Sequence, residues 1–301
     1  MIGFVHLINY GREDKKSMSM NMIDTKDIFN VKNAYTHAGS FHSDDVFATA
    51  FLQILQPEIE VHRIFNVTSD LDGIIYDIGC GEFDHHQKDK RYRENGVPYA
   101  AFGLLWEKFG TLIMDEENVL KFDEKFIQAL DLSDNTGCDN DLAFAISDFN
   151  PKWDEEKETD EAFFEAVEFA KGILKRRFSK IESNAKACKI VKAELEELPD
   201  DIEIFELQQD VPWKAAVKDT QIKYVIYKSN RGGFNIQCVP SDEDKDVLKK
   251  ALPEKWRGKT QEELEEITNV KGFRFCHTSG FLCATETIEG AREIAKMALE
   301  S

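Results

Sequence analysis

The first half of the chain alternates short apolar runs with longer helical patterns, and this alternation restricts the fold more than any other feature. The run "GIIYDIG" (73–79) is almost continuously apolar, as is typical of a strand buried in a parallel sheet. Because strands that alternate with helices usually pair in parallel, we predict a doubly wound α/β sheet that binds ligands at its carboxyl edge. Strands are expected at 33–39, 60–65 and 73–79, and helices at 44–55, 99–109 and 118–131.

The second half begins with one long amphipathic pattern and then becomes rich in strands. Apolar residues recur at three- and four-residue steps from 160 to 197, which predicts a long helix, and Pro199 ends the pattern. Further strands are expected at 202–207, 223–229, 234–240 and 273–278, with a closing helix at 289–300.

A chain of 301 residues is long enough for two domains, each with its own core. We predict a divergent N-terminal extension (1–33), an α/β catalytic domain with a parallel sheet (34–158), a connecting long helix (159–198) and a smaller α+β C-terminal domain that binds substrate (199–301).

The charge of the chain limits its partners. The 57 acidic residues outnumber the 38 basic ones, which gives a formal net charge of −19. A protein that holds duplex nucleic acid mainly by neutralising phosphates has a basic face, so we expect no bulk duplex DNA binding. Any contact with nucleic acid should be short and local, and metal ions could supply positive charge at one site.

The expected location is the cytoplasm. No apolar run approaches the ~18 residues of a membrane span, and the first residues lack the features of a signal or transit peptide. The six cysteines are scattered without a CxxC pair, which fits a reducing compartment. Nuclear and mitochondrial locations remain open.

Histidines and acids concentrate at the predicted ends of strands and helices. "THAGSFHSDD" joins a strand to a helix, Asp77 lies near the end of a buried strand, "DHH" follows directly, and "LDLSDNTG" ends a helix. Mixed histidine and carboxylate ligands suit Mn²⁺, Fe²⁺, Co²⁺ or Zn²⁺, and a bridging carboxylate can hold two ions ~3.5–4 Å apart. The combined pattern favours a dinuclear metal site built from His37, His42, Asp44, Asp45, Asp77, Asp84, His85, His86, Asp131 and Asp134.

Each motif alone also has a structural interpretation. "DHH" could be a polar turn, and Asp44 and Asp45 could simply favour a helix N-terminus. Asp131 and Asp134 could be polar residues at a helix end. Asp77 is harder to explain in this way, because it stands where a buried strand requires apolar side chains.

These motifs resemble those of the DHH phosphoesterase superfamily, and most closely one branch of it, the melanocyte-proliferating-gene-one family of exonucleases. That branch has "THxGxFHxDE" where this chain has "THAGSFHSDD", and a segment like "DIGCGEFDHHQ". Its later signatures are similar to "LDLSDNTG", "VPWK", "GGFNIQCVP", "LPEKWRGKTQEELEEITNV" and "CHTSGFLCATETIEGA", so the resemblance extends over nearly all of the chain from about residue 34.

The resemblance implies a metal-dependent 3′–5′ exonuclease that acts on RNA or a short oligonucleotide. A DHH-type domain would bind two Mn²⁺ ions that activate a water, with Mg²⁺, Co²⁺ or Zn²⁺ as alternatives. Carried over by position, the metal ligands would be His37, His42, Asp44, a bridging Asp77, His85, and either Asp131 or Asp134, with Asp131 preferred.

Further roles follow from the same resemblance. The catalytic residues would be Asp77, Asp84 and His86, and His86 would face the scissile phosphate. Substrate contacts would come from His277, Ser279 and Gly280, and from Arg257, whose guanidinium suits a phosphate. His277 could also be a core histidine, and Trp256 is expected to serve packing and not base stacking.

Two departures from the family pattern bear on function. Asp45 stands where the family has glutamate, and the run between Asp77 and the histidines is shorter and less basic, which leaves some RNA contacts in question. Two alternatives therefore stay open. One is a phosphatase, pyrophosphatase or dinucleotide hydrolase acting on small molecules, and the other is a catalytically silent metal-binding interaction protein. The oligomeric state is also open, a homo-oligomer included.

Overall fold

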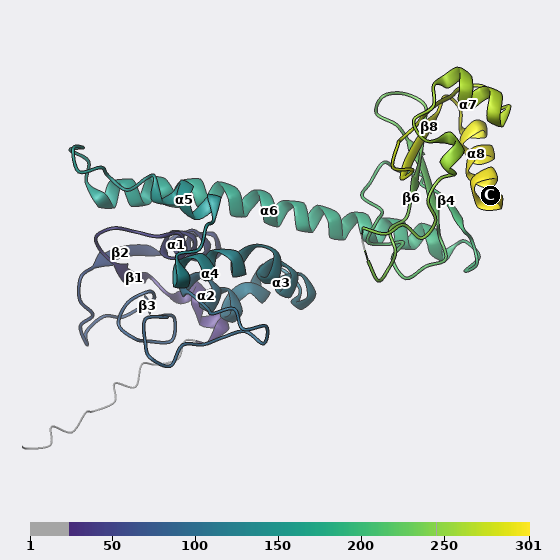
Figure 1. Cartoon of the computed structure of the whole chain (residues 1–301). Helices are drawn as coiled ribbons and strands as arrows, with labels where there is room; N and C mark the ends of the chain where they lie inside the picture. Colours follow the sequence, from purple (N-terminus) through teal and green to yellow (C-terminus); the bar gives the residue numbers. More distant parts are fainter. Residues whose placement is uncertain (1–23, 245) are drawn as a thin grey trace, which may run out of the picture. The chain divides into compact units, whose positions relative to one another are not determined.

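The computed structural model describes residues 24–244 and 246–301 (Figure 1). The chain divides into two compact units, the first ending at Phe178 and the second beginning at Ser179. The division falls within helix α6 (Thr159–Glu196), which occupies the stretch where the sequence predicts a long helix. Most of the predicted N-terminal extension lies outside the described residues, and its last part forms the 3₁₀ helix η1 (Thr25–Asn30).

The first unit contains a parallel sheet of three strands in the order β2-β1-β3. These strands are β1 (Asn33–His37), β2 (Glu60–Ile64) and β3 (Ile74–Ile75), and both pairings are parallel, as predicted. Strand β3 is shorter than the predicted run 73–79. The chain leaves the sheet here because Asp77 adopts a left-handed backbone with φ 57°, which does not continue a strand.

The helices of the first unit are α1 (Ser43–Leu55), α2 (Ala101–Phe109), η2 (Gly110–Leu112), α3 (Glu116–Phe122), η3 (Asp123–Ile127), α4 (Gln128–Thr136) and α5 (Asp141–Ser147). The single helix predicted at 118–131 is thus a run of three segments, with one π turn, η3, between α3 and α4. Gly137 ends the run with φ 69°, a conformation that glycine adopts without strain.

Aromatic side chains fill the core of the first unit. The rings of Phe47 and Phe102 stack at 5.7 Å between α1 and α2, and Trp106 stacks on Phe178 of α6 at 5.7 Å. The first half of α6 belongs to this core, because its apolar stripe, represented by Phe163, is fully buried. Helix α1 is therefore enclosed by packing along nearly its whole length, and the acids of its first turn are buried with it.

The second unit contains a mixed sheet of five strands in the order β4-β5-β6-β8-β7. Strands β4 and β5 are parallel and the other pairings are antiparallel. The strands are β4 (Ile204–Glu206), β5 (Tyr224–Lys228), β6 (Phe234–Cys238), β7 (Phe273–Cys276) and β8 (Leu282–Thr285), joined by η4 (Glu254–Trp256), α7 (Gln261–Thr268) and α8 (Ile288–Glu300). Strand β8 and helix α7 were not predicted from the sequence.

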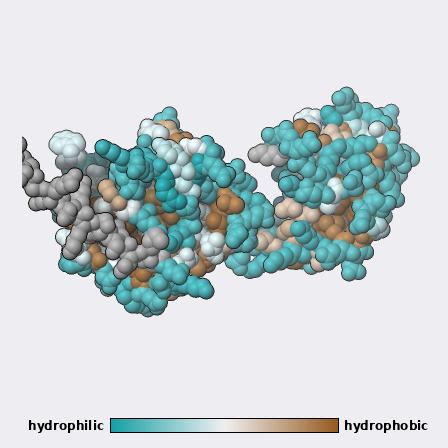
Figure 2. Space-filling view, turned by 90° about the horizontal axis from the view of Figure 1, so that it is seen from below, coloured by the Kyte–Doolittle hydropathy of each residue, from teal (hydrophilic) through white to brown (hydrophobic). Residues whose placement is uncertain are grey.

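The visible surface of each unit is mostly hydrophilic, with smaller hydrophobic areas (Figure 2). Isolated exposed side chains such as Phe65 and Trp153 are common on protein surfaces and need no special explanation. Within the described residues, no helix combines the length and the apolar character that crossing a bilayer requires.

Candidate metal centre

The first motif lies between β1 and α1. His37 is the last residue of β1, and His42 immediately precedes α1. Asp44 and Asp45, in the first turn of α1, are both fully buried. The backbone N–H of His42 donates to Oδ1 of Asp45 at 2.9 Å, and this capping hydrogen bond stabilises the start of α1. Oδ2 of Asp44 accepts from the N–H of Ala101 at 3.3 Å, whereas Oδ1 of Asp44 and Oδ2 of Asp45 have no hydrogen-bond partner.

Two residues that the sequence analysis missed hold the loop between these histidines. The side chain of Asn150 accepts from the backbone N–H of Phe41 at 3.1 Å and donates to its carbonyl at 2.9 Å. Arg63 donates to the carbonyl of Gly39 at 2.5 Å, and its guanidinium lies 4.4 Å from the centre of the Phe163 ring. Neither residue belongs to a recognisable motif, because its partners are distant in sequence.

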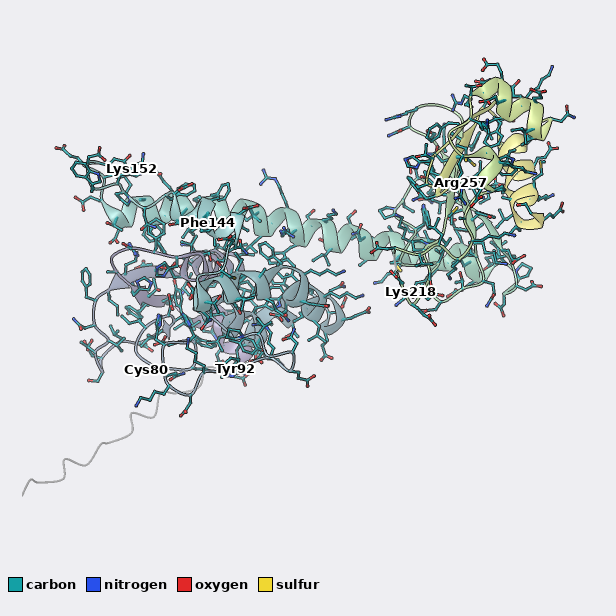
Figure 3. The ribbon with its side chains drawn as sticks, in the orientation of Figure 1. Cys80, Tyr92, Phe144, Lys152, Lys218 and Arg257 are labelled. Atoms are coloured by element: carbon teal, nitrogen blue, oxygen red, sulfur yellow. The ribbon has the colours of Figure 1, made fainter. Side chains whose placement is uncertain are left out.

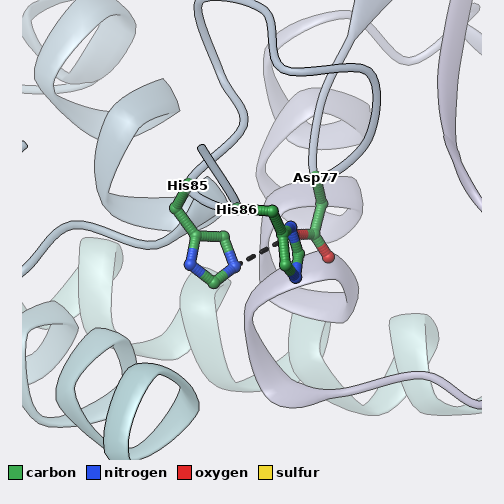
Figure 4. A group of neighbouring side chains, drawn as sticks. All are labelled: Asp77, His85 and His86. Carbon is green, nitrogen blue, oxygen red and sulfur yellow. Dashed lines mark ion pairs between the residues drawn. The ribbon is translucent and has the colours of Figure 1, made fainter. Parts of the chain in front are cut away.

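Asp77 lies at the centre of the cluster. Its Oδ2 is 3.2 Å from Nε2 of His37. Its Oδ1 is 3.1 Å from Nε2 of His85, as the dashed line in Figure 4 marks. The two oxygens of one carboxylate thus contact histidines from two different motifs. The positive φ of this residue is strained for a side chain other than glycine, and such strain is concentrated at functional sites.

The other acids extend the cluster on both sides of Asp77. Oδ2 of Asp45 is 3.2 Å from Nε2 of His37, on the Oδ2 side of Asp77. On the Oδ1 side, Nε2 of His85 is 3.5 Å from Asp44 and 3.2 Å from Asp134. Among the described residues, three groups each have ligand atoms within 4.8 Å of one another, and Asp77 belongs to two of them: His37, Asp45 and Asp77; His42, Asp44 and Asp134; and Asp77, His85 and His86.

Several atoms of this cluster are buried without a hydrogen-bond partner. They are Oδ1 of Asp44, Oδ2 of Asp45, both carboxylate oxygens of Asp77 and Nε2 of His85. Burying such atoms unpaired is unfavourable, and native proteins leave few of them. Divalent cations bound among these donors would satisfy them, so the donor set fits a metal centre.

The histidine rings are oriented to offer Nε2 to the acids. Nδ1 of His37 lies 3.2 Å from the carbonyl of Ala38, and Nδ1 of His85 lies 3.3 Å from Oδ1 of Asn135. Both partners are acceptors, so in each ring Nδ1 carries the hydrogen when the ring is neutral. The lone pair of Nε2 is then available for a metal, with an outer hydrogen bond of the kind that orients metal-bound histidines. Asn135 is a further residue that the sequence analysis missed.

Asp84 orients His86. Its carboxylate accepts from Nδ1 of His86 at 2.8 Å, from the N–H of His86 at 3.0 Å and from the N–H of Cys80 at 2.6 Å. Burial by itself would raise the pKa of Asp84, but these hydrogen bonds lower it to about 2. Asp84 therefore holds the His86 ring at Nδ1. The His86 side chain is 58% exposed, so the rest of the ring is accessible to a substrate.

Burial and crowding shift the pKa values of the whole cluster. Burial raises the pKa of Asp45 to about 7, and burial together with Asp44 raises that of Asp134 to about 9. Burial lowers the pKa of a histidine, but Asp45 and Asp77 overcome this effect and raise the pKa of His37 to about 11. Asp77 and Asp44 likewise raise the pKa of His85 to about 9. Without metal, the cluster therefore holds protons between its acids at neutral pH.

The structure places Asp134 of the fourth motif in the cluster, whereas Asp131, the ligand preferred from the sequence, pairs with Arg93, so which of the two binds metal stays a prediction. Asp131 is fully buried, but its carboxylate pairs with Arg93 at 2.8 Å and accepts from the N–H of Gly103 at 3.3 Å. Arg93 also pairs with Asp123 at 2.5 Å. Asp131 thus forms a buried ion pair with Arg93, and its hydrogen bond from Gly103 ties α4 to α2, where Gly103 has no room for a side chain.

Three of the predicted substrate contacts of the second unit lie in one turn, and the fourth, Arg257, packs against it. His277, Ser279 and Gly280 connect β7 to β8, and the N–H of Ser279 donates to Nδ1 of His277 at 3.1 Å. Arg257 packs against Gly280 and donates to the carbonyl of Leu252 at 3.0 and 2.7 Å. His277 is half-buried and so is not a core histidine, whereas Trp256 is buried, as expected for a packing residue. Substrate binding by this turn stays a prediction.

Fold and site together define a mixed α/β protein in which a buried cluster of histidines and aspartates is able to hold metal ions. Residues 33–299 match the sequence model of the Uncharacterised protein family (UPF0160), the MYG1 family, and the chain belongs to that family. The chain is 29% identical to the MYG1 protein of Schizosaccharomyces pombe, over 90% of this chain and 98% of that protein. It is 27% identical to the proteins named MYG1 exonuclease of Rattus norvegicus and Homo sapiens, over 88% of this chain and 84% and 85% of theirs.

Proposed function

We propose that the chain is a metal-dependent phosphodiesterase of the DHH superfamily, a 3′–5′ exonuclease that acts on RNA through a dinuclear metal centre. One observation carries this proposal: both carboxylate oxygens of Asp77 are buried without a hydrogen-bond partner, and each faces a different set of histidine and carboxylate donors. The names of the rat and human relatives support a nuclease-type function.

The donor atoms divide into two sets about Asp77. Oδ2 of Asp77 with His37 and Asp45 would hold one ion. Oδ1 of Asp77 with His85 and its two further acids, Asp44 and Asp134, would hold the other, and His42 lies beside Asp134 at 3.9 Å. Mixed nitrogen and oxygen donors suit Mn²⁺, with Co²⁺ or Zn²⁺ as alternatives that the same ligands accept.

When bound, two such ions supply positive charge at the scissile phosphate and lower the pKa of an attacking water. Among the side chains of the protein, His86 would contact the substrate phosphate. Its hydrogen bond to Asp84 raises the pKa of His86, which favours a protonated ring that donates to a phosphate oxygen. The buried acids Asp44, Asp45 and Asp77 are shielded from bulk water, so their charges act more strongly than they would in solvent.

The test combines a metal analysis of the purified protein with a panel of substrates in Mn²⁺. A 5′-labelled oligoribonucleotide should be shortened stepwise from its 3′ end, and Asp77→Asn should remove both the bound metal and the hydrolysis. Asp154→Asn, which changes an exposed acid of the same unit, serves as the matched control and should retain both. Full activity of the Asp77→Asn protein would contradict the proposal.

The same panel separates the two alternatives. Hydrolysis of pyrophosphate or dinucleotides, with the oligoribonucleotide left intact, would assign the site to small phosphoesters. Bound metal without turnover of any phosphoester would instead indicate a silent metal-binding protein. Degradation from the 5′ end would keep the phosphodiesterase and correct its polarity.

A further inference from the structure

The segment that follows the double histidine is unusually basic for this chain. Four of the six residues in "KDKRYR" (88–93) are lysine or arginine, whereas the whole chain has a formal net charge of −19. The segment begins two residues after His86, the residue proposed to meet the scissile phosphate. Local positive charge therefore lies next to the proposed reaction centre.

A buried arginine fixes the end of this segment. The guanidinium of Arg93 lies between Asp123 and Asp131 and only 3.9 Å from the centre of the Tyr99 ring. The backbone then turns tightly: the N–H of Gly96 donates to the carbonyl of Arg93 at 2.9 Å, and the N–H of Arg93 donates to that of Val97 at 2.9 Å. The basic segment is thus anchored at its end by the buried Arg93 side chain and by the backbone turn that follows it.

The two lysines differ from the two arginines in their partners. Arg91 pairs with Glu107 at 2.5 Å, and Arg93 pairs with Asp123, so each guanidinium already has a carboxylate partner. Lys88 and Lys90 are exposed, and neither ammonium lies in an ion pair with a carboxylate of the described residues. Asp89, exposed between them, offsets part of their charge.

Lys90 is linked directly to the metal cluster. Its ammonium donates to Oδ1 of Asn135 at 2.8 Å, and the same oxygen lies 3.3 Å from Nδ1 of His85. A single amide oxygen therefore separates the Lys90 ammonium from the imidazole of a proposed metal ligand. A phosphate group bound to Lys90 would be close to a phosphate held at the cluster.

Tyr92 adds an aromatic face beside the lysines. Its side chain is 59% exposed, and it lies at the lower edge of the first unit in Figure 3, where Cys80 lies too. The backbone of Tyr92 forms an antiparallel bridge with Pro98, so the ring is carried by ordered chain. A single exposed tyrosine is common, but one that follows two exposed lysines in the same short segment has the features of a stacking platform.

We propose that Lys88, Lys90 and Tyr92 form a track for single-stranded nucleic acid, called here the strand track, which holds the nucleotides next to the scissile phosphate. The two ammonium groups bind backbone phosphates, and the Tyr92 ring stacks on a base. This inference rests on the proposed phosphodiesterase function and names its substrate class as a polynucleotide strand. A pyrophosphate or a phosphomonoester is too short to occupy the whole track.

The test measures binding and turnover separately. Binding of a fluorescein-labelled single-stranded oligoribonucleotide is followed by anisotropy without added metal, and kcat and KM for its hydrolysis are measured in Mn²⁺. Tyr92→Leu should weaken binding and raise KM by about 5- to 150-fold, the range expected for one lost base stack, whereas Tyr92→Phe should restore both. Lys88→Ala should reduce the slope of log affinity against log salt by about 0.7.

Lys90→Ala is expected to lower kcat as well, since it also frees Asn135 beside His85. Lys175→Ala removes an exposed lysine of α6 and is the matched control, with no expected change in the salt slope. Unchanged binding and KM in Tyr92→Leu and Lys88→Ala, with hydrolysis intact, would overturn the strand track and leave the proposed function standing. If the unaltered protein binds the oligonucleotide through these residues but hydrolyses no phosphodiester, the strand track stands and the proposed function fails.

Discussion

The two units of the chain treat their polar side chains in opposite ways. In the first unit, the cluster around Asp77 leaves five buried polar atoms without a hydrogen-bond partner. In the second unit, the turn that holds His277 satisfies its groups locally, with Ser279 bonded to the His277 ring and Arg257 bonded to a backbone carbonyl. The only buried side-chain atom without a partner among the described residues of this unit is Nε1 of Trp256.

This difference shows that the cluster of the first unit, and not the turn of the second, requires bound protons or cations. Because the polar groups of this turn are hydrogen-bonded within the protein, the turn can be stable without a bound ligand. A buried cluster of acids and histidines needs either protons or cations between its members. When no cation is bound, this requirement raises the pKa of Asp134 to about 9 and that of His37 to about 11.

The largest effect is expected from removing the arginine that holds α4 beside the cluster. Arg93→Ala leaves the carboxylate of Asp131 buried without its partner, and breaking such a pair from one side typically costs about 3–5 kcal/mol. Urea denaturation should show this loss in the transition of the first unit. Arg292→Ala, which breaks an exposed pair with Glu206 in the second unit, is the control and should change stability far less, because solvent screens exposed ion pairs. Equal effects of the two substitutions would remove the contrast between the units.

The same ion pair explains how much of the site could be predicted from sequence. Asp131 and Asp134 are three residues apart on α4, and their motif does not show which of them faces the histidines. The choice depends on Arg93, which reaches Asp131 across 38 positions of the chain. Residues whose function depends on such distant partners, as Asn135 and Asn150 also do, carry no local signal.

The fold was predictable where the pattern of apolar residues was strong. The parallel strands β1 and β2 and the long helix α6 lie close to their predicted bounds. Strand β8 was missed because its four residues, "LCAT", are too few to show alternation. Strand β3 was predicted too long because the backbone of Asp77 departs from the sheet, and that departure is what turns its carboxylate into the cluster.

Metal ions should stabilise the first unit alone. If the cluster binds Mn²⁺, the ion at a concentration of 100 times its Kd adds about 2.7 kcal/mol to the stability of the unit that binds it. Calorimetry with Mn²⁺ and with a chelator should therefore shift one transition and leave the other in place. A shift of both transitions, or of neither, would argue against a metal site confined to the cluster.

Metal binding should also tighten as the pH rises from 6 to 8. The pKa of His37 is raised to about 11 and that of His85 to about 9, so both rings are protonated at neutral pH in the metal-free protein. A cation must displace these protons, and proton release makes apparent affinity increase with pH. Titration calorimetry in two buffers of different ionisation enthalpy measures the protons released. A heat of binding that is independent of buffer would contradict this view of the cluster.

The smallest effect is expected in the turn of the second unit. Ser279→Ala removes one hydroxyl that lies 2.7 Å from Nδ1 of His277, on a side chain that is exposed. Because the backbone N–H of residue 279 still donates to the same nitrogen, the loss should not exceed about 1 kcal/mol. Metal content should be unchanged, since the turn contains none of the proposed ligands. Elemental analysis and urea denaturation check both values, and a loss of metal in this variant would show that the two units are coupled in a way that their separate hydrogen bonds do not predict.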